Sequence, residues 1–112
     1  MKLPNARKAV AEREKIVEYL LNPAHPDGMS RAKFFLALGF RPEEWRRLAE
    51  ALRELGRAYP VAEKVDTAHG TKYIVVGALR TPSGQMPTVK SVWIVDRGSV
   101  APRLVTAYPL EE

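Results

Sequence analysis

Residues 41–60 read RPEEWRRLAEALRELGRAYP, and this stretch decides how the rest of the chain is organised. Pro42 suits the first position of a helix, and the two glutamates after it suit the positive end of the helix dipole. Apolar residues then recur at helical spacing, so one buried stripe is predicted: Trp45, Leu48, Leu52, Leu55 and Tyr59. The opposite face alternates acidic and basic residues, which is typical of a solvated helix face.

Pro60 ends this helix, and the hydrophobic period changes from helical to alternating. The new period predicts strands at residues 61–67, 71–80, 89–96 and 103–108, separated by turns short enough for an antiparallel meander. Upstream, helices are predicted at residues 11–21 and 30–38, the second with Ser30 as its N-cap and Gly39 as its end. A short extended piece is expected around Val10. We therefore expect an α+β fold in which about three N-terminal helices pack on a four-stranded antiparallel β-meander.

The length of 112 residues predicts one domain, with a mainly helical half at 1–59 and a sheet half at 60–112. The chain has no cysteine and only two histidines, so we expect no disulfide, no metal site and no cofactor. Charges interrupt every apolar run, which predicts a cytoplasmic protein with no membrane partner. The net charge of +5 suits RNA or another phosphate-bearing ligand.

A candidate site lies at residues 22–40. Pro23 and Pro26 restrict the backbone around His25, whose imidazole has the intrinsic pKa for proton transfer. Arg31 and Lys33 fall in the first turn of the helix that follows, where cations oppose the helix dipole unless an anion binds there. The alternative is that both cations lie in water and that the histidine only stabilises a turn.

Short motifs along nearly the whole chain resemble an uncharacterised bacterial domain-of-unknown-function family: LPNA at 3–6, HPxGxxxAKFF at 25–35, LGF at 38–40, GTKY at 70–73, VW at 92–93 and PRLVTAYP at 102–109. More distantly, the chain is similar to ribonuclease-type toxin domains of the barnase, EndoU, colicin and RelE group, which place helices ahead of a four-stranded antiparallel sheet. That resemblance implies metal-independent RNA cleavage by a histidine with basic and hydroxyl side chains. This chain departs from those domains in having no obvious second catalytic histidine, because His69 lies in a turn just before the Thr-Lys-Tyr motif.

Metal-free RNA cleavage needs a base, an acid and cations for the charged phosphorus centre. The catalytic candidates are His25, Lys33, Arg103, Thr106 and Tyr108. The candidates for phosphate binding are Arg31, Lys33, Lys72 and Arg103. Strand alternation predicts that Thr106 and Tyr108 share one face while Arg103 points to the other.

Each of these residues also has a structural interpretation. Lys72 suits a solvent-facing strand position, Tyr108 suits packing, and Arg103 suits an ion pair with Asp66 or Asp96. The sequence thus leaves open whether the chain is a metal-independent endoribonuclease. The alternative is a non-enzymatic module that binds a small partner protein, for example as one half of a two-gene pair. The oligomeric state is not indicated.

Overall fold

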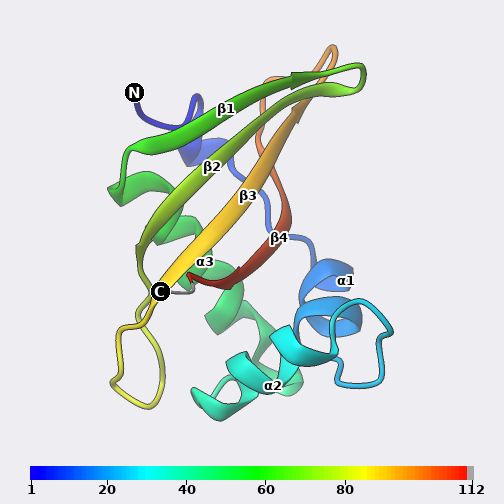
Figure 1. The fold of residues 1–112 in the computed structure, drawn as a ribbon, viewed down its shortest axis with the longest axis vertical. Helices are drawn as coiled ribbons and strands as arrows, with labels where there is room; N and C mark the ends of the chain where they lie inside the picture. Colours follow the sequence, from blue (N-terminus) through cyan, green and yellow to red (C-terminus); the bar gives the residue numbers. More distant parts are fainter. Residues whose placement is uncertain (111–112) are drawn as a thin grey trace.

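A computed structural model describes residues 1–110, and it has the predicted α+β architecture (Figure 1). The helical elements come first and the sheet follows. They are η1 (Ala6–Lys8), α1 (Arg13–Lys15), the π-helix η2 (Ile16–Leu20), α2 (Met29–Ala37), η3 (Pro42–Glu44) and α3 (Trp45–Ala58). The strands are β1 (Val61–Thr67), β2 (Gly70–Ala78), β3 (Thr88–Asp96) and β4 (Arg103–Pro109).

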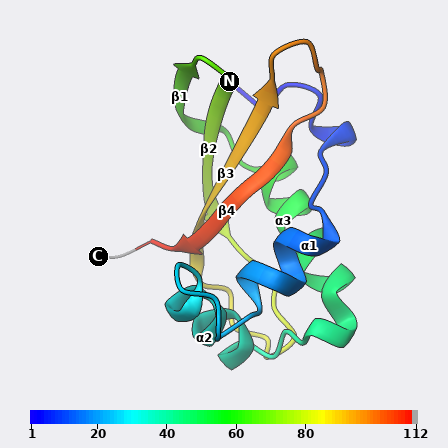
Figure 2. The same ribbon diagram turned by 90° about the vertical axis from the view of Figure 1, so that its right-hand side faces the viewer.

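The sheet is the predicted antiparallel meander, with strand order β1-β2-β3-β4. Helix α3 packs across one face of it, and Figure 2 shows no helix on the other face. Helices α1 and α2 lie towards the β4 side of the sheet (Figures 1 and 2). The short piece around Val10 is extended as predicted, because Val10 forms a parallel bridge with Arg103.

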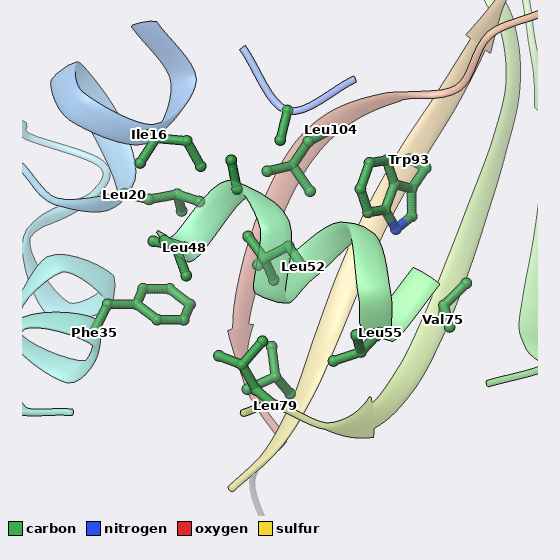
Figure 3. Close-up of a cluster of buried hydrophobic side chains, with 14 of the residues drawn as sticks. Ile16, Leu20, Phe35, Leu48, Leu52, Leu55, Val75, Leu79, Trp93 and Leu104 are labelled. Atoms are coloured by element: carbon green, nitrogen blue, oxygen red, sulfur yellow. The ribbon is translucent and has the colours of Figure 1, made fainter. Parts of the chain in front are cut away.

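The core lies between α3 and the sheet. Leu48, Leu52 and Leu55 are buried, as the helical stripe predicts, and each contributes about 1.5–3 kcal/mol by leaving water. They pack with side chains from the other elements, shown in Figure 3: Ile16, Leu20, Phe35, Val75, Leu79, Trp93 and Leu104. Trp45, predicted to face the sheet with these leucines, is partly buried and packs against the core.

Two helix details also differ from the sequence predictions. The helix expected at 11–21 is one α-helical turn followed by a π-helix, in which the N–H of Leu21 donates to the carbonyl of Ile16 at 2.8 Å. The N-cap of α2 is Gly28, not Ser30, and no side chain caps it. Gly39 ends α2 as predicted. Its φ is +96°, a left-handed conformation that leaves the helix and that glycine adopts without strain.

A β-bulge in β4 overturns the predicted alternation. Thr106 pairs with Val92 and Leu104 pairs with Trp93, so Val105 is an extra residue between them. The register therefore places Arg103, Thr106 and Tyr108 opposite Ile94, Val92 and Lys90, which are alternate residues of β3. Arg103 shares the face of Thr106 and Tyr108, contrary to the expectation from a regular strand.

Candidate functional site

Tyr19 is the centre of a hydrogen-bonded cluster where η2, α2 and β4 meet. Its hydroxyl oxygen accepts a hydrogen bond from Nη1 of Arg31 at 2.6 Å. The same hydroxyl lies 3.0 Å from Oγ1 of Thr106, which is 87 residues away in the chain. Because Arg31 donates to Tyr19, the tyrosine hydrogen is available for Thr106. The half-buried Tyr19 thus joins the helical half of the chain to the last strand.

Arg31 is held without an acidic partner. Its guanidinium donates to the backbone carbonyl of Asp27 at 3.0 Å and lies over the rings of Tyr19 and Tyr108, at 5.8 and 5.2 Å. Among residues 1–110, no carboxylate oxygen comes within the 4.0 Å that defines an ion pair with it. A half-buried guanidinium stabilised only by neutral groups keeps N–H donors and a full charge for an anion.

Two lysines add positive charge to the same tyrosine rings. Nζ of Lys15 lies 5.2 Å from the centre of the Tyr19 ring, and Nζ of Lys90 lies 5.6 Å from the centre of the Tyr108 ring. Beside them is an open cavity of about 310 Å³, lined by Asp27, Ser30, Arg31, Tyr108 and Pro109. Among these lining residues Arg31 is the cation and Asp27 the acid, and Lys90 lies against the ring of Tyr108, another lining residue. Arg31 and the nearby Lys90 favour a phosphate-bearing ligand.

His25 packs edge-on against Tyr19, with ring centres 5.0 Å apart and planes at 73°. Its Nδ1 accepts the backbone N–H of Asp27 at 3.0 Å. In the neutral ring this bond places the hydrogen on Nε2, so Nε2–H is the donor that the ring presents. The histidine therefore stabilises its own turn, as the structural interpretation expects, while it also joins the cluster.

Local packing explains why residues 22–28 lie on Tyr19. Gly28 touches the tyrosine so closely that a Cβ there would lie 2.7 Å from the Tyr19 carbonyl oxygen and 2.9 Å from its ring. Only glycine fits this approach. Tyr19 itself lies in the π-helix. In this wider turn Ile16 and Leu20 are buried, while the Tyr19 hydroxyl lies within hydrogen-bond distance of Thr106. Single π-helical turns are frequent at functional sites.

The structure thus brings together four of the predicted site residues: His25, Arg31, Thr106 and Tyr108. Together with Tyr19 and Lys90 they form what we call the Tyr19 cluster. The sequence pointed to neither of these two, because Tyr19 falls at helical spacing with Ile16 and Leu20 in the helix predicted at 11–21. For Lys90, the sequence indicates only that it lies in a predicted strand, and the pairing with Tyr108 is seen only in the structure.

The other predicted site residues lie elsewhere. Arg103 is at the opposite end of β4 from Tyr108, where it donates to both carboxylate oxygens of Asp96 at 2.7 and 3.0 Å. This hydrogen bonding lowers the pKa of Asp96 and raises that of Arg103. Lys33 is exposed on α2, and Lys72 is half-buried opposite Ile94 of β3.

No group of three or more His, Cys, Asp or Glu side chains within residues 1–110 is placed to hold a metal ion. No helix in this part of the chain is long and apolar enough to span a membrane. Whether the site acts without a metal ion stays a prediction.

The fold and the cluster define a small α+β domain with a polar, cationic site at the junction of its two halves. The chain belongs to the family described as Domain of unknown function (DUF6883), whose model matches residues 2–111. This confirms the resemblance to an uncharacterised family. No curated protein matches the sequence significantly.

A solved structure shares the fold: the "Contact-dependent growth inhibition toxin - immunity protein complex from Klebsiella pneumoniae 342". A chain of that complex is similar with a TM-score of 0.73, over 96% of this chain and 97% of that chain. The sequences are 18% identical, so the likeness is one of fold. The relationship to toxin domains and to ribonucleases stays a prediction.

Proposed function

We propose that this chain is a toxin-type domain that binds RNA at the Tyr19 cluster and cleaves it without a metal ion. The observation that carries the proposal is Arg31, a half-buried guanidinium whose contacts are all neutral and which borders an open cavity. A phosphodiester supplies the missing negative charge. Lys90 and Lys15 raise the local positive potential further.

The proposed chemistry is attack of the ribose 2′-oxygen on phosphorus as the bond from phosphorus to the 5′-oxygen breaks. The 2′-hydroxyl loses one proton and the 5′-oxygen gains one, so the products are a 2′,3′-cyclic phosphate and a 5′-hydroxyl. Thr106 and Arg31 donate hydrogen bonds to the phosphate oxygens, which gain charge in the transition state, and Tyr19 positions both side chains. His25 is the proton carrier.

The hydrogen bond at Nδ1 sets a condition on that role. Donation from Nε2 of a neutral imidazole leaves an anionic ring, so His25 acts as an acid only in its protonated form. In that form Nδ1 also carries a hydrogen and no longer accepts the N–H of Asp27. The turn at residues 25–27 must therefore adjust during catalysis.

The test uses fluorescein-labelled single-stranded RNA, with binding followed by anisotropy over a range of salt and cleavage followed on gels. Lys90→Ala should weaken binding and lower the slope of log affinity against log salt by about one. The matched control is Lys64→Ala, which removes an exposed lysine from β1 and should change neither. Lys33→Ala tests the prediction that this exposed lysine also contacts phosphate.

His25→Ala separates binding from cleavage. It removes the proton carrier and keeps the cations, so RNA binding should survive while cleavage is lost. Absence of RNA binding at low salt by the unmodified protein would refute the proposal. Binding with no cleavage, unaffected by His25→Ala, would leave a recognition module.

A second candidate is a module that binds a small partner protein, as one half of a two-gene pair. The similar fold in a toxin–immunity protein complex favours it, since both components of such a complex bind a protein. The two candidates differ in a direct measurement. A stable complex with the product of an adjacent gene, together with no RNA binding, would select the partner-binding module.

A further inference from the structure

A second groove lies on the helical side of the molecule, between the segment that follows η1 and the first turns of α3. It is an open cavity of about 400 Å³. Its lining consists of Arg7, Lys8, Ala9, Val10, Ala11, Trp45, Arg46, Ala49, Glu50 and Arg53. We call it the α3 groove. None of its residues belongs to the Tyr19 cluster.

The rim of the α3 groove is cationic. Arg53 has structural partners, because it pairs with Glu50 and its Nε donates to the carbonyl of Ala9 at 2.8 Å. Arg7, Lys8 and Arg46 are exposed and form no ion pair with any residue between 1 and 110. On this part of α3, Arg47 pairs with Glu44 and Arg53 with Glu50, so among the described residues the unpaired cations of the rim are Arg46 and the two from η1.

The interior of the groove is apolar. Ala9, Ala11 and Ala49 are buried, Val10 is 44% exposed, and the half-buried Trp45 contributes an aromatic ring. The guanidinium carbon of Arg46 lies 4.8 Å from the centre of that ring. A stacked guanidinium keeps its N–H groups available for phosphate oxygens at its edge.

We propose that the α3 groove binds one nucleotide of single-stranded RNA, with the base taking the place of the exposed Arg46 guanidinium on the Trp45 ring and the phosphates at Arg7, Lys8 and Arg46. Aromatic surface plus unpaired cations is the combination that single-stranded nucleic acid requires. An acidic peptide could form ion pairs with the rim cations, but its carboxylates would not stack on the Trp45 ring. The volume falls within the range of small-ligand sites, about 300–1,000 Å³.

This inference rests on the proposed function for its ligand and adds a second contact to the same RNA. Two extended residues, helix α1 and the π-helix η2 connect Ala11, at the groove, to Tyr19. This path spans at most about 17 Å, so one short strand can contact both sites. The groove would then hold the RNA while the Tyr19 cluster acts on a phosphodiester nearby.

The two tryptophans provide the experiment. Trp93 is 0% exposed and bonded to Ser91, so ligand-dependent changes in fluorescence report on Trp45. The probe is a single-stranded RNA hexanucleotide with 2′-O-methyl groups, which cannot be cleaved through its 2′-oxygens. Saturable quenching is expected in the unmodified protein. Trp45→Phe should remove the quenching while thermal melting shows that the variant is folded.

Charge variants test the rim with a matched control. The double variant Arg7→Ala/Lys8→Ala should weaken binding by about tenfold at low salt. Arg57→Ala/Arg97→Ala removes two other exposed cations outside the groove and should weaken binding less than about twofold, since distant exposed charges are screened. Equal effects of the two double variants would overturn the inference.

The outcomes separate this inference from the proposed function. Quenching that persists in Lys90→Ala, which lies outside the groove, supports the groove even if the Tyr19 cluster binds no RNA. Binding seen by anisotropy without any change in Trp45 fluorescence refutes the groove and leaves the Tyr19 cluster intact. Absence of binding in both measurements refutes both. Equal quenching by a polyglutamate peptide would assign the groove to an acidic protein and also overturn the inference.

Discussion

At the scale of single residues, Ser91 carries the polar interactions inside the core. It is 0% exposed, its hydroxyl donates to the carbonyl of Val75 at 2.9 Å, and it accepts Nε1–H of Trp93 at 2.9 Å. The serine lets a fully buried indole lie between the sheet and α3 with its N–H satisfied. Burying Trp93 depends on this single oxygen.

Ser91→Ala is therefore expected to lower the free energy of unfolding by about 1–3 kcal/mol, because it leaves the indole N–H buried without an acceptor. Urea denaturation followed by circular dichroism measures this. Thr88→Ala is the control on the same strand, since Thr88 is exposed and its loss should change stability by no more than about 0.5 kcal/mol. Equal stabilities of the two variants would contradict the role of Ser91.

The contacts of Tyr19 could not be predicted from the sequence. The pattern of apolar residues at 16, 19 and 20 predicts a buried helix face, and Ile16 and Leu20 are indeed buried. The widened π-helical turn brings the Tyr19 hydroxyl to Thr106. No residue type in this segment predicts a π-helix. Its site role was therefore absent from the sequence, whereas the unusual prolines around His25 did indicate the adjacent turn.

At the scale of secondary-structure elements, strands and α-helices follow from hydrophobic period and from Pro and Gly. Predicted strand 61–67 is identical to β1, and predicted helix 30–38 differs from α2 by one residue at each end. The bulge in β4 was not predicted, because Val105 is an ordinary strand residue. It nevertheless decides which side chains share a face: both Leu104 and Ala107 are buried although they are three residues apart.

Deletion of Val105 tests the bulge. Without the extra residue, Leu104 and Ala107 are two positions apart in the strand, so regular alternation keeps both on the core face. We therefore expect the deletion to lower the free energy of unfolding by less than about 1 kcal/mol, close to the effect of Val105→Ala, which keeps the bulge. Urea denaturation of both variants measures this. A loss of about 2 kcal/mol or more on deletion alone would show that the bulge itself is required for the packing of β4.

At the scale of the whole molecule, the two halves of the chain meet at both ends of β4. At one end, Tyr19 bonds to Thr106. At the other, the N–H of Val10 donates to the carbonyl of Pro102 at 2.8 Å, and the N–H of Leu104 donates to the carbonyl of Val10 at 2.9 Å. The candidate site therefore exists only in the folded chain. Hydrophobic periodicity does not predict contacts between residues that are far apart in sequence. The sequence therefore suggested single candidate residues but not which of them lie together.

Arg103 lies at the second of these junctions, and its pair with Asp96 predicts how stability depends on pH. The hydrogen bonds from Arg103 lower the pKa of Asp96 below the ordinary value of 3.8. The folded state then binds a proton less readily than the unfolded state does. The stabilisation is present above that ordinary value and is lost as pH falls below it, through the pKa of the folded state.

The free energy of unfolding should therefore fall more steeply below pH about 4 in the unmodified protein than in Asp96→Asn, which has no carboxylate to titrate. Arg103→Gln should flatten the slope in the same way, because it removes the cause of the lowered pKa and keeps the carboxylate. Arg97→Gln removes a neighbouring exposed cation and should leave the slope unchanged. Urea denaturation at several pH values between about 2.5 and 6 measures all four proteins. If Asp96→Asn and Arg103→Gln keep the full slope, acid destabilisation arises at other carboxylates, and the pair joins β3 to β4 without setting the response of the protein to pH.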